Sequence, residues 1–460
     1  MAKTTAATVL DIAELSFSDL VLLQSPETPA DDRRRLRVLD TVAAEFGRGG
    51  SGLLAVAIGQ VPRVGDLRRR LLPLSRRLAL MDHPSRSQIL KKHGLGSDVP
   101  LKKLDRSVSS FAKLLRHSGK LALVEMVNNT ESINSGFVCF EKMDEFDHPG
   151  ELTVMMIWRI SLGILIARAC DIVIGGGQLE QSITDFGTAK ARLIHYHSEL
   201  DNIIIREENS TKRKCRLKKV AGKPYQLGSQ RRSGSLCPFC KSDYGTPVMA
   251  IKDDNSRDTS VQGQASEISL LNLWQEWHYD FGILTVLTSP LFLSSSEGEP
   301  CLVNQEYHHP NGHTHLQLCN GRKIFSVRCS PESFIVQVGE AADILSRGKL
   351  KSTLHSVSRP LTFTDISRET FVVFLQPSWD KTLSYSGYSL DTEEQSSHNN
   401  ETSIISNGSA DSCDDDVCMQ EILEKIPPLS SRLREGMTFA EFSRQTTKQY
   451  YGGGGIQQNN

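Results

Sequence analysis

The segment Trp277–Gly282 and the apolar run Ile283–Thr288 constrain the fold of this chain more than any other stretch. Aromatic and β-branched residues favour strands, and successive side chains of a strand point to opposite faces. His278 and Asp280 are therefore expected on one face of a strand. An imidazole and a carboxylate so placed are candidate metal ligands, although a His-x-Asp triplet alone is more often structural.

A third candidate ligand, His355, lies further along the chain. Two histidines and one carboxylate form the ligand face that binds Fe(II) and leaves positions open for oxygen and a co-substrate. Arg368 and Thr370 stand at the head of the apolar run Phe371–Leu375, where strand alternation places both on one face. A guanidinium fork beside a hydroxyl can bind a carboxylate. The order of these motifs favours a metal site over chance.

In this order the motifs resemble those of the plant-type 2-oxoglutarate and Fe(II)-dependent dioxygenases, the family that includes isopenicillin N synthase-like enzymes. The resemblance is clearest in FIVQVGEAADILSRGKLKSTLHSV and in SRETFVVFLQP. It implies that His278, Asp280 and His355 bind Fe(II). It also implies that Arg368 and Thr370 bind the far carboxylate of 2-oxoglutarate.

The segment ARLIHYHS resembles the family strand that carries an Asn-x-Tyr-Pro motif, which implies that Tyr196 helps to hold 2-oxoglutarate. Ile194 and His197 stand where the family usually has Asn and Pro. Ser356 replaces the arginine that commonly follows the distal histidine, and Thr370 replaces a serine but keeps a hydroxyl. None of these departures affects an expected iron ligand.

The resemblance implies a mainly β fold with flanking helices (α+β), built on a double-stranded β-helix of the jelly-roll or cupin-like type. It implies a monomeric oxygenase that uses Fe(II), 2-oxoglutarate and O2 to oxidise a small organic substrate. Hydroxylation is the default outcome, with desaturation and ring closure as alternatives, while 2-oxoglutarate becomes succinate. From another class, the alternative is a non-catalytic scaffold that binds a protein or nucleic acid through charged insertions.

The chain divides into regions of different composition. We expect an N-terminal helix and strand region in 1–150, an oxygenase core in 151–380 with a flexible basic insertion at about 200–266, a disordered acidic linker in 381–424, and a C-terminal helix and tail in 425–460. Within the insertion, Cys237 and Cys240 have the spacing of half a zinc site, but no second pair follows. A solvated loop is favoured over a nucleic-acid contact.

The overall charge excludes some partners. The 460 residues carry a formal net charge of -1, which argues against a whole-protein commitment to nucleic acid or to an anionic membrane. The ten cysteines are scattered, and the first residues lack a basic region followed by an apolar core. We therefore expect a reduced cytoplasmic protein, with the nucleus as the alternative location.

The N-terminal region has helical periodicity. Residues 31–46 place Leu36, Leu39, Val42, Ala43 and Phe46 on one helix face. The glycines at 47–52 match Gly-x-Gly-x-x-Gly, but here a helix precedes them and the strand Leu53–Ile58 follows, the reverse of a dinucleotide site. A simple helix-to-strand turn is therefore favoured.

Two further helices are expected. Residues 66–81 repeat leucine at helical spacing, with arginines on a solvated face. The apolar run 158–174 contains Arg159, Arg168 and Asp171, too many charges for a membrane span, and is expected to be a buried helix under a sheet.

A cluster of histidines lies between the candidate ligand strands, in 308–315. Four imidazoles so close could bind a transition metal. Pro310 and Gly312 favour a loop instead, with contact to the substrate entrance as its use.

Overall fold

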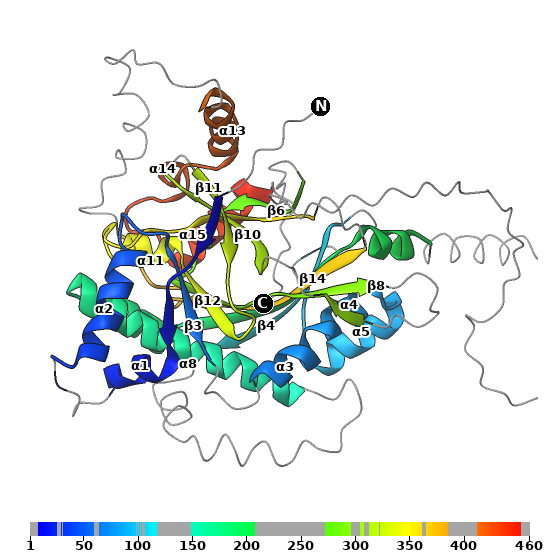
Figure 1. Ribbon diagram of the computed structural model, residues 1–460, viewed down its shortest axis with the longest axis horizontal. Coiled ribbons are helices and arrows are strands. Elements are labelled where there is room, and N and C mark those ends of the chain that lie inside the picture. Colours follow the sequence, from blue (N-terminus) through cyan, green and yellow to red (C-terminus); the bar gives the residue numbers. More distant parts are fainter. Residues whose placement is uncertain are drawn as a thin grey trace, which may run out of the picture.

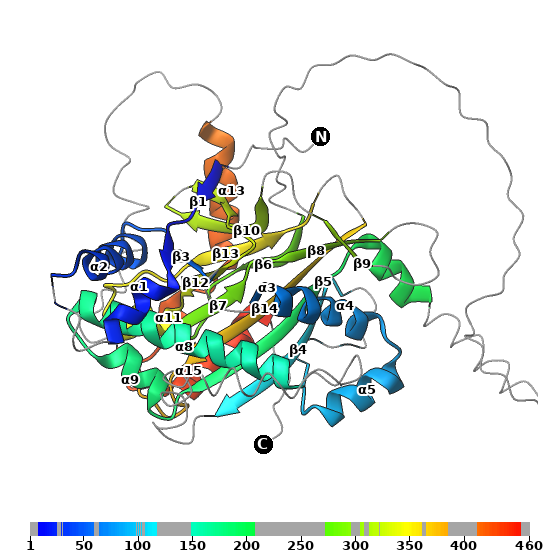
Figure 2. The same cartoon turned by 60° about the horizontal axis from the view of Figure 1, so that its bottom comes forward.

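Two β-sheets face each other in this protein, and most of the helices cover the outer face of the larger sheet (Figure 1 and Figure 2). The computed structural model describes residues 8–24, 29, 31–58, 64–97, 99, 101, 103, 106–116, 149–207, 272–295, 304–307, 312–321, 323–360, 365–384 and 412–451. The basic insertion beyond 207, with Cys237 and Cys240, and the linker between 385 and 411 lie outside these residues.

The smaller sheet has five strands. In spatial order they are β1 (Thr8–Asp11), β11 (Lys323–Arg328), β10 (His313–Asn320), β13 (Leu354–Ser358) and β6 (Leu273–His278). All neighbours are antiparallel except β1, which pairs in parallel with β11. This sheet therefore joins the first described residues of the chain to the segments that carry His278 and His355.

The larger sheet has nine strands. Its main path is β2 (Glu14–Ser16), β3 (Leu53–Ala57), β12 (Ser333–Val338), β7 (Leu284–Thr288), β14 (Ile366–Gln376), β5 (Thr188–Tyr196) and β4 (Val108–Arg116), with β8 (Leu291–Ser295) beside β14 and β9 (Asn304–Tyr307) beside β8. The long strand β14 pairs with β8 through its first half and with β7 through its second half. Strand β14 can therefore present Arg368 and Thr370 close to the end of β7.

Separate hydrophobic clusters hold the layers together. One lies between the large sheet and the helices, and includes Val286, Phe371 and Leu165. A second lies between the two sheets, and includes Leu287 and Leu318. Strands buried on both faces read as continuous apolar runs, which explains segments such as Phe371–Leu375. The arrangement of facing, curled sheets with flanking helices confirms the predicted double-stranded β-helix.

The helices fall into three groups along the chain. They are α1 (Phe17–Val21), the 3-10 helix η1 (Leu22–Gln24), α2 (Arg33–Phe46), α3 (Val64–Leu71), α4 (Pro73–Leu80) and α5 (His83–Lys92), then α8 (Pro149–Ile174) and α9 (Gln178–Thr184), and finally α11 (Glu340–Leu345), α13 (Ser412–Lys425), α14 (Leu429–Arg432) and α15 (Phe439–Tyr451). Helix α8 packs against both β7 and β14, beneath the large sheet in Figure 2.

Helix α8 is the buried helix expected for 158–174. Its charged residues are held locally: Arg168 donates to Glu180, and Asp171 accepts from the backbone N–H groups of Leu179 and Glu180 at the start of α9. Arg159 is fully buried between the rings of Phe334 and Phe371. None of the helices in the described ranges is long and apolar enough to cross a membrane.

The expected helix-to-strand turn at 47–52 is present between α2 and β3. Gly52 has φ +73°, and a Cβ there would lie 2.4 Å from the Thr353 hydroxyl, so this glycine is required by the turn itself. The predicted inner face of α2 is partly wrong. Leu36 is 43% exposed, whereas Val38, Val42 and Phe46 are buried.

The prediction of a single helix over residues 66–81 is also wrong. It is divided at Leu72 into α3 and α4, because Pro73 has no backbone N–H to continue the hydrogen-bond ladder. Two of its arginines are buried rather than solvated. Arg68 donates to the backbone of Ser289, and Arg76 donates to the Asp201 carboxylate. Arg68 therefore connects α3 to the residue that follows β7, and Arg76 connects α4 to the helical segment that follows β5.

The acidic linker ends earlier than predicted. Helix α13 begins at Ser412, so disorder was wrongly expected as far as 424. Met419 and Ile422 are buried, and Ile422 packs with Trp277 and Leu354 on the outer side of the small sheet. The expected C-terminal helix is α15, whose Phe439 is buried in the main core.

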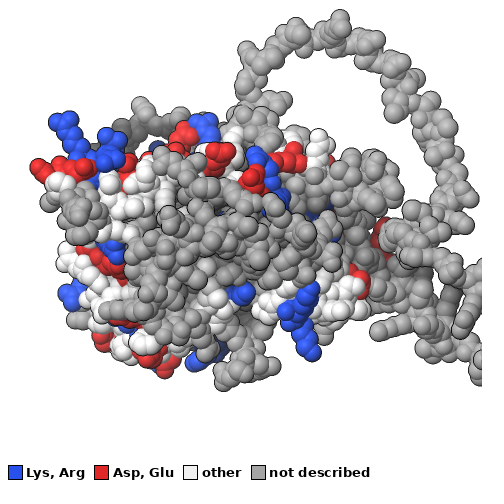
Figure 3. Space-filling view, turned by 90° about the horizontal axis from the view of Figure 1, so that it is seen from below, with Lys and Arg blue, Asp and Glu red and all other residues white. Residues whose placement is uncertain are grey.

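Acidic and basic side chains are mixed on the molecular face shown in Figure 3. The described lysines and arginines there do not gather into a patch of one sign. The charged insertions through which the scaffold alternative would bind a protein or nucleic acid lie outside the described residues, so that alternative stays a prediction.

A buried charge network joins β5, β14 and α4. His195 Nδ1 lies 2.8 Å from a carboxylate oxygen of Glu369 on the paired strand, and His195 Nε2 lies 3.4 Å from Asp201. Arg76 donates to Asp201 at 2.9 Å, and Ser75 donates to Glu369. All these side chains are almost fully buried. Burial lowers the pKa of His195, but Glu369 and Asp201 more than offset this effect and raise it to about 9.

We predict that Arg159→Met stabilises the protein. The guanidinium Nε and one terminal nitrogen of Arg159 have no hydrogen-bond partner among the described residues, and burial lowers its pKa to about 9. Each unsatisfied buried donor costs roughly 1–3 kcal/mol of stability. The cation–π contacts with the two rings contribute about 2 kcal/mol, which is less than the cost of the two donors together. Urea unfolding should show a gain of about 1 kcal/mol. Arg168→Met, which removes the paired arginine of the same helix, is the control and should not stabilise. A clear loss of stability in Arg159→Met would contradict this account.

We predict that the buried network makes stability depend on alkaline pH. The folded pKa of His195 is raised above its unfolded value, so its contribution is complete below about pH 6.5 and is lost as pH rises through about 9. The loss should be of the order of 3 kcal/mol. Urea unfolding across this range measures it, and His195→Gln should flatten the slope whereas His83→Gln, at an exposed position, should not. A wild-type stability that is constant across the range would refute the assignment.

Candidate metal centre

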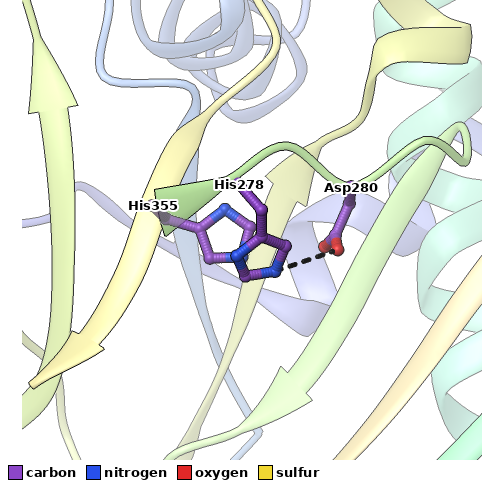
Figure 4. A group of neighbouring side chains, drawn as sticks. All are labelled: His278, Asp280 and His355. Atoms are coloured by element: carbon purple, nitrogen blue, oxygen red, sulfur yellow. Dashed lines mark ion pairs between the residues drawn. The ribbon is translucent and has the colours of Figure 1, made fainter. Parts of the chain in front are cut away.

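Three potential metal ligands meet between the two sheets (Figure 4). His278 is the last residue of β6, and His355 lies directly opposite it on β13. The centroids of the two imidazole rings are 4.3 Å apart. Asp280 lies two residues beyond the end of β6, so the expectation that both residues of the His-x-Asp triplet lie within one strand is wrong in detail. The three side chains nevertheless converge, and all are buried.

Backbone contacts define which nitrogen each histidine presents. His278 Nδ1 lies 2.8 Å from the Glu276 carbonyl, and His355 Nδ1 lies 3.0 Å from the Thr353 carbonyl. A carbonyl oxygen only accepts, so both Nδ1 atoms carry the proton in these contacts. Each Nε2 then presents its lone pair toward the other ligands, as a metal site requires.

The carboxylate is held from one side. Thr285 Oγ1 and Gln337 Nε2 both donate to Asp280 Oδ2, at 2.6 and 2.5 Å. The other oxygen, Oδ1, lies 3.9 Å from His278 Nε2. Burial raises the pKa of Asp280, but the two histidines and these hydrogen bonds more than offset this effect and lower it, so the group is ionised.

The electrostatics of the site suit a divalent cation. Burial, and then the neighbouring His355, lower the pKa of His278 to about 4, so that imidazole is neutral at physiological pH. One ligand atom from each of the three residues lies within 4.8 Å of the others. Two imidazoles that present Nε2 and one ionised carboxylate therefore fit an Fe(II) ion with positions left open. No other group of three such residues meets the same criterion in the described part of the chain.

Tyr196 reaches the site through an intermediate residue. Its hydroxyl donates to Gln275 Oε1 at 2.8 Å, and Gln275 Nε2 lies 2.9 Å from His278 Nε2. A bulge in the pairing of β6 with β13 allows Gln275 and His278 to reach the same side. The tyrosine is thus linked to the candidate ligand His278 by a glutamine that the sequence did not suggest.

Arg368 and Thr370 lie on the inner face of β14, as their spacing predicted. Arg368 is fully buried, its guanidinium stacks over the Tyr196 ring at 4.9 Å, and its Nε donates to the Thr314 carbonyl. Thr370 Oγ1 donates to the Thr288 carbonyl at 3.2 Å. Both side chains therefore belong to the space between the sheets that also contains Tyr196.

The histidine cluster is not simply a loop. His313 and His315 belong to β10, whose pairing with β11 is irregular between His313 and Gln317, whereas 308–311 lie outside the described residues. His315 has φ +58° and contacts the rings of Trp274 and Phe292. The loop prediction is therefore wrong for these two histidines. The expected contact with the substrate entrance stays a prediction.

The sequence of part of this region matches a known family. Residues 299–377 match the 2OG-Fe(II) oxygenase superfamily, a segment that includes His355, Arg368 and Thr370. The chain carries a 2OG-Fe(II) oxygenase domain. The predicted enzyme class, a non-haem oxygenase, is therefore confirmed at the level of this superfamily, and so are the cofactors Fe(II), 2-oxoglutarate and O2.

Several solved structures are similar to this oxygenase domain and its surroundings at low sequence identity. A full-length Neurospora crassa protein, crystallised in complex with alpha-KG and 5-formyluracil, is 12% identical over 98% of this chain and 99% of its own, with a TM-score of 0.46. The rice dioxygenase for auxin oxidation is 15% identical over 83% of this chain and 88% of its own, with a TM-score of 0.40. No curated protein is similar enough to the chain to match it.

Sequence reasoning missed three polar residues around the candidate ligands. Gln337 interrupts the apolar strand Ser333–Val338, and a polar residue at an inward position was a readable signal. Thr285 is likewise a polar residue at an inward position of a mainly apolar strand, β7. Gln275 carried no such signal, because only the bulge in β6 brings it to the side of His278.

Proposed function

We propose that His278, Asp280 and His355 are the iron ligands of this oxygenase domain. The observation that carries the proposal is the convergence of two Nε2 lone pairs and one ionised carboxylate, all buried and each fixed by separate hydrogen bonds. Metal ligands of this kind need partners that fix their orientation before the metal arrives. The backbone carbonyls of Glu276 and Thr353 meet this need for the histidines.

Arg368 and Thr370 bind the far carboxylate of 2-oxoglutarate in this proposal. A buried guanidinium pairs strongly with a carboxylate because little water competes for it. The stacked Tyr196 ring and the Thr314 carbonyl hold the guanidinium in place. Tyr196 has a positioning role, since its hydroxyl donates to Gln275 rather than pointing to an open site.

The reaction is the oxidation of a small organic substrate, with hydroxylation as the default outcome. When bound, iron with 2-oxoglutarate and O2 supplies the oxidising chemistry, in which 2-oxoglutarate loses CO2 to become succinate and one oxygen atom enters the substrate. The protein supplies buried side chains between the sheets, where little water competes, together with fixed donors for the carboxylates. We propose that the domain belongs to the plant-type, isopenicillin N synthase-like branch, because the order of its motifs follows that branch.

The test is an anaerobic titration of the metal-free protein with Fe(II) and 2-oxoglutarate. A visible charge-transfer band is expected only when both bind at one site. His355→Ala should abolish the band, because two protein ligands remain. Arg368→Ala should leave iron binding intact but lower the affinity for 2-oxoglutarate by roughly 10- to 100-fold, the equivalent of about 1.4–2.8 kcal/mol.

Exposed residues provide matched controls. His83→Ala and Arg69→Ala remove the same side-chain types from the surface and should leave the band unchanged. Thermal unfolding checks that every variant is folded. A folded wild-type protein that gives no band would contradict the proposal, as would a His355→Ala variant that keeps it.

A further inference from the structure

Two donors from neighbouring strands converge on a single oxygen of Asp280. Gln337 on β12 and Thr285 on β7 are direct cross-strand partners, and both point toward the candidate metal centre. The Thr285 hydroxyl and the Gln337 amide donate to the same oxygen, Oδ2. A carboxylate oxygen that accepts two short hydrogen bonds has little electron density left for a metal.

The other carboxylate oxygen faces the histidines. Oδ1 lies 3.9 Å from His278 Nε2, across the space where the three ligand atoms converge. The two oxygens of Asp280 are therefore not equivalent. Oδ2 accepts hydrogen bonds from the protein, and Oδ1 faces the metal position.

We propose that Gln337 and Thr285 are positioning residues that hold the Asp280 carboxylate with Oδ1 facing the metal position. This inference rests on the proposed function, in which Asp280 is an iron ligand. A carboxylate whose orientation is fixed before a metal arrives loses less conformational freedom on binding, so both residues should increase the affinity for a divalent cation.

Gln337 also contacts the second histidine ligand. Its Nε2 lies 3.2 Å from His355 Nε2, so one amide group contacts both a carboxylate and an imidazole. Since His355 Nδ1 is committed to the Thr353 carbonyl, the amide must donate to the lone pair that a metal would use. A metal at His355 Nε2 would replace this contact, whereas Asp280 Oδ2 would keep its hydrogen bond from Gln337.

The amide nitrogen of Gln337 pairs with two of the candidate ligands. Gln337 is 2% exposed, and its Oε1 has no hydrogen-bond partner among the described residues. Leaving a buried carbonyl unpaired costs stability, and a leucine would fit the apolar strand Ser333–Val338 without this cost. Gln317 also has a buried amide atom, Nε2, without a partner among the described residues, so the feature that distinguishes Gln337 is the contact of its Nε2 with Asp280 and His355.

The test measures metal affinity, independently of turnover. Mn(II), which stays divalent in air, is titrated into the metal-free protein and its free fraction is followed by electron paramagnetic resonance. Gln337→Leu and Thr285→Val should each weaken Mn(II) binding by roughly 10- to 100-fold, as expected for partners that orient a ligand. Thr285→Ser, which keeps the hydroxyl, should restore wild-type affinity.

A matched glutamine serves as control. Gln317 on β10 is equally buried, but it hydrogen-bonds to Ser356 and alternates with the inward residues Leu316 and Leu318, so it lies on the opposite face of its sheet. Gln317→Leu should leave Mn(II) affinity unchanged. Thermal unfolding without metal separates loss of the fold from loss of the site, and each variant should be folded at the temperature of the titration.

Asp280→Ala distinguishes failure of this inference from failure of the proposed function. If Asp280→Ala binds Mn(II) like the wild type, Asp280 is not a ligand and the proposed function falls with the inference. If Asp280→Ala loses binding but Gln337→Leu and Thr285→Val keep it, only the positioning role is overturned. A Thr285→Ser variant as weak as Thr285→Val would also overturn the role of the hydroxyl.

Discussion

The antiparallel pairing of β13 with β6 is the constraint on which the site depends. It sets His355 directly opposite His278, so that two imidazoles lie 4.3 Å apart without any contribution from a flexible loop. Directly opposed residues on paired strands are the closest side-chain neighbours that a sheet offers. A shift of one residue in this register would turn His355 to the outer face of the sheet and destroy the site.

The large sheet supplies the remaining polar groups of the site. The large sheet places Thr285 and Gln337 beside Asp280, and it presents Arg368 and Thr370 from β14 toward the same space. Helix α8 closes the outer face of this sheet, while the cluster between the sheets keeps the inner space apolar apart from these groups. Low solvent access strengthens the charged contacts among these buried residues. The site is therefore a product of both sheets rather than of one motif.

Much of this could be predicted from local sequence, and the rest could not. The convergence of His278, Asp280 and His355 followed from spacing and order, and the buried helix at Trp158–Ile174 followed from its apolar run. The buried pairing of Arg76 with Asp201 and the link from Tyr196 through Gln275 depend on contacts between residues far apart in sequence, or on a bulge that no local pattern encodes. Helix α13 was missed because its acidic composition suggested disorder, whereas tertiary packing of Ile422 stabilises it.

The most direct test of the central claim is a crystal structure of the protein with Mn(II), using anomalous diffraction to locate the ion. We predict one strong anomalous peak within about 2.0–2.4 Å of His278 Nε2, His355 Nε2 and Asp280 Oδ1, with Asp280 Oδ2 still bound to Thr285 and Gln337. A peak elsewhere, or no peak between β6 and β13, would contradict the assignment of this site as the iron centre.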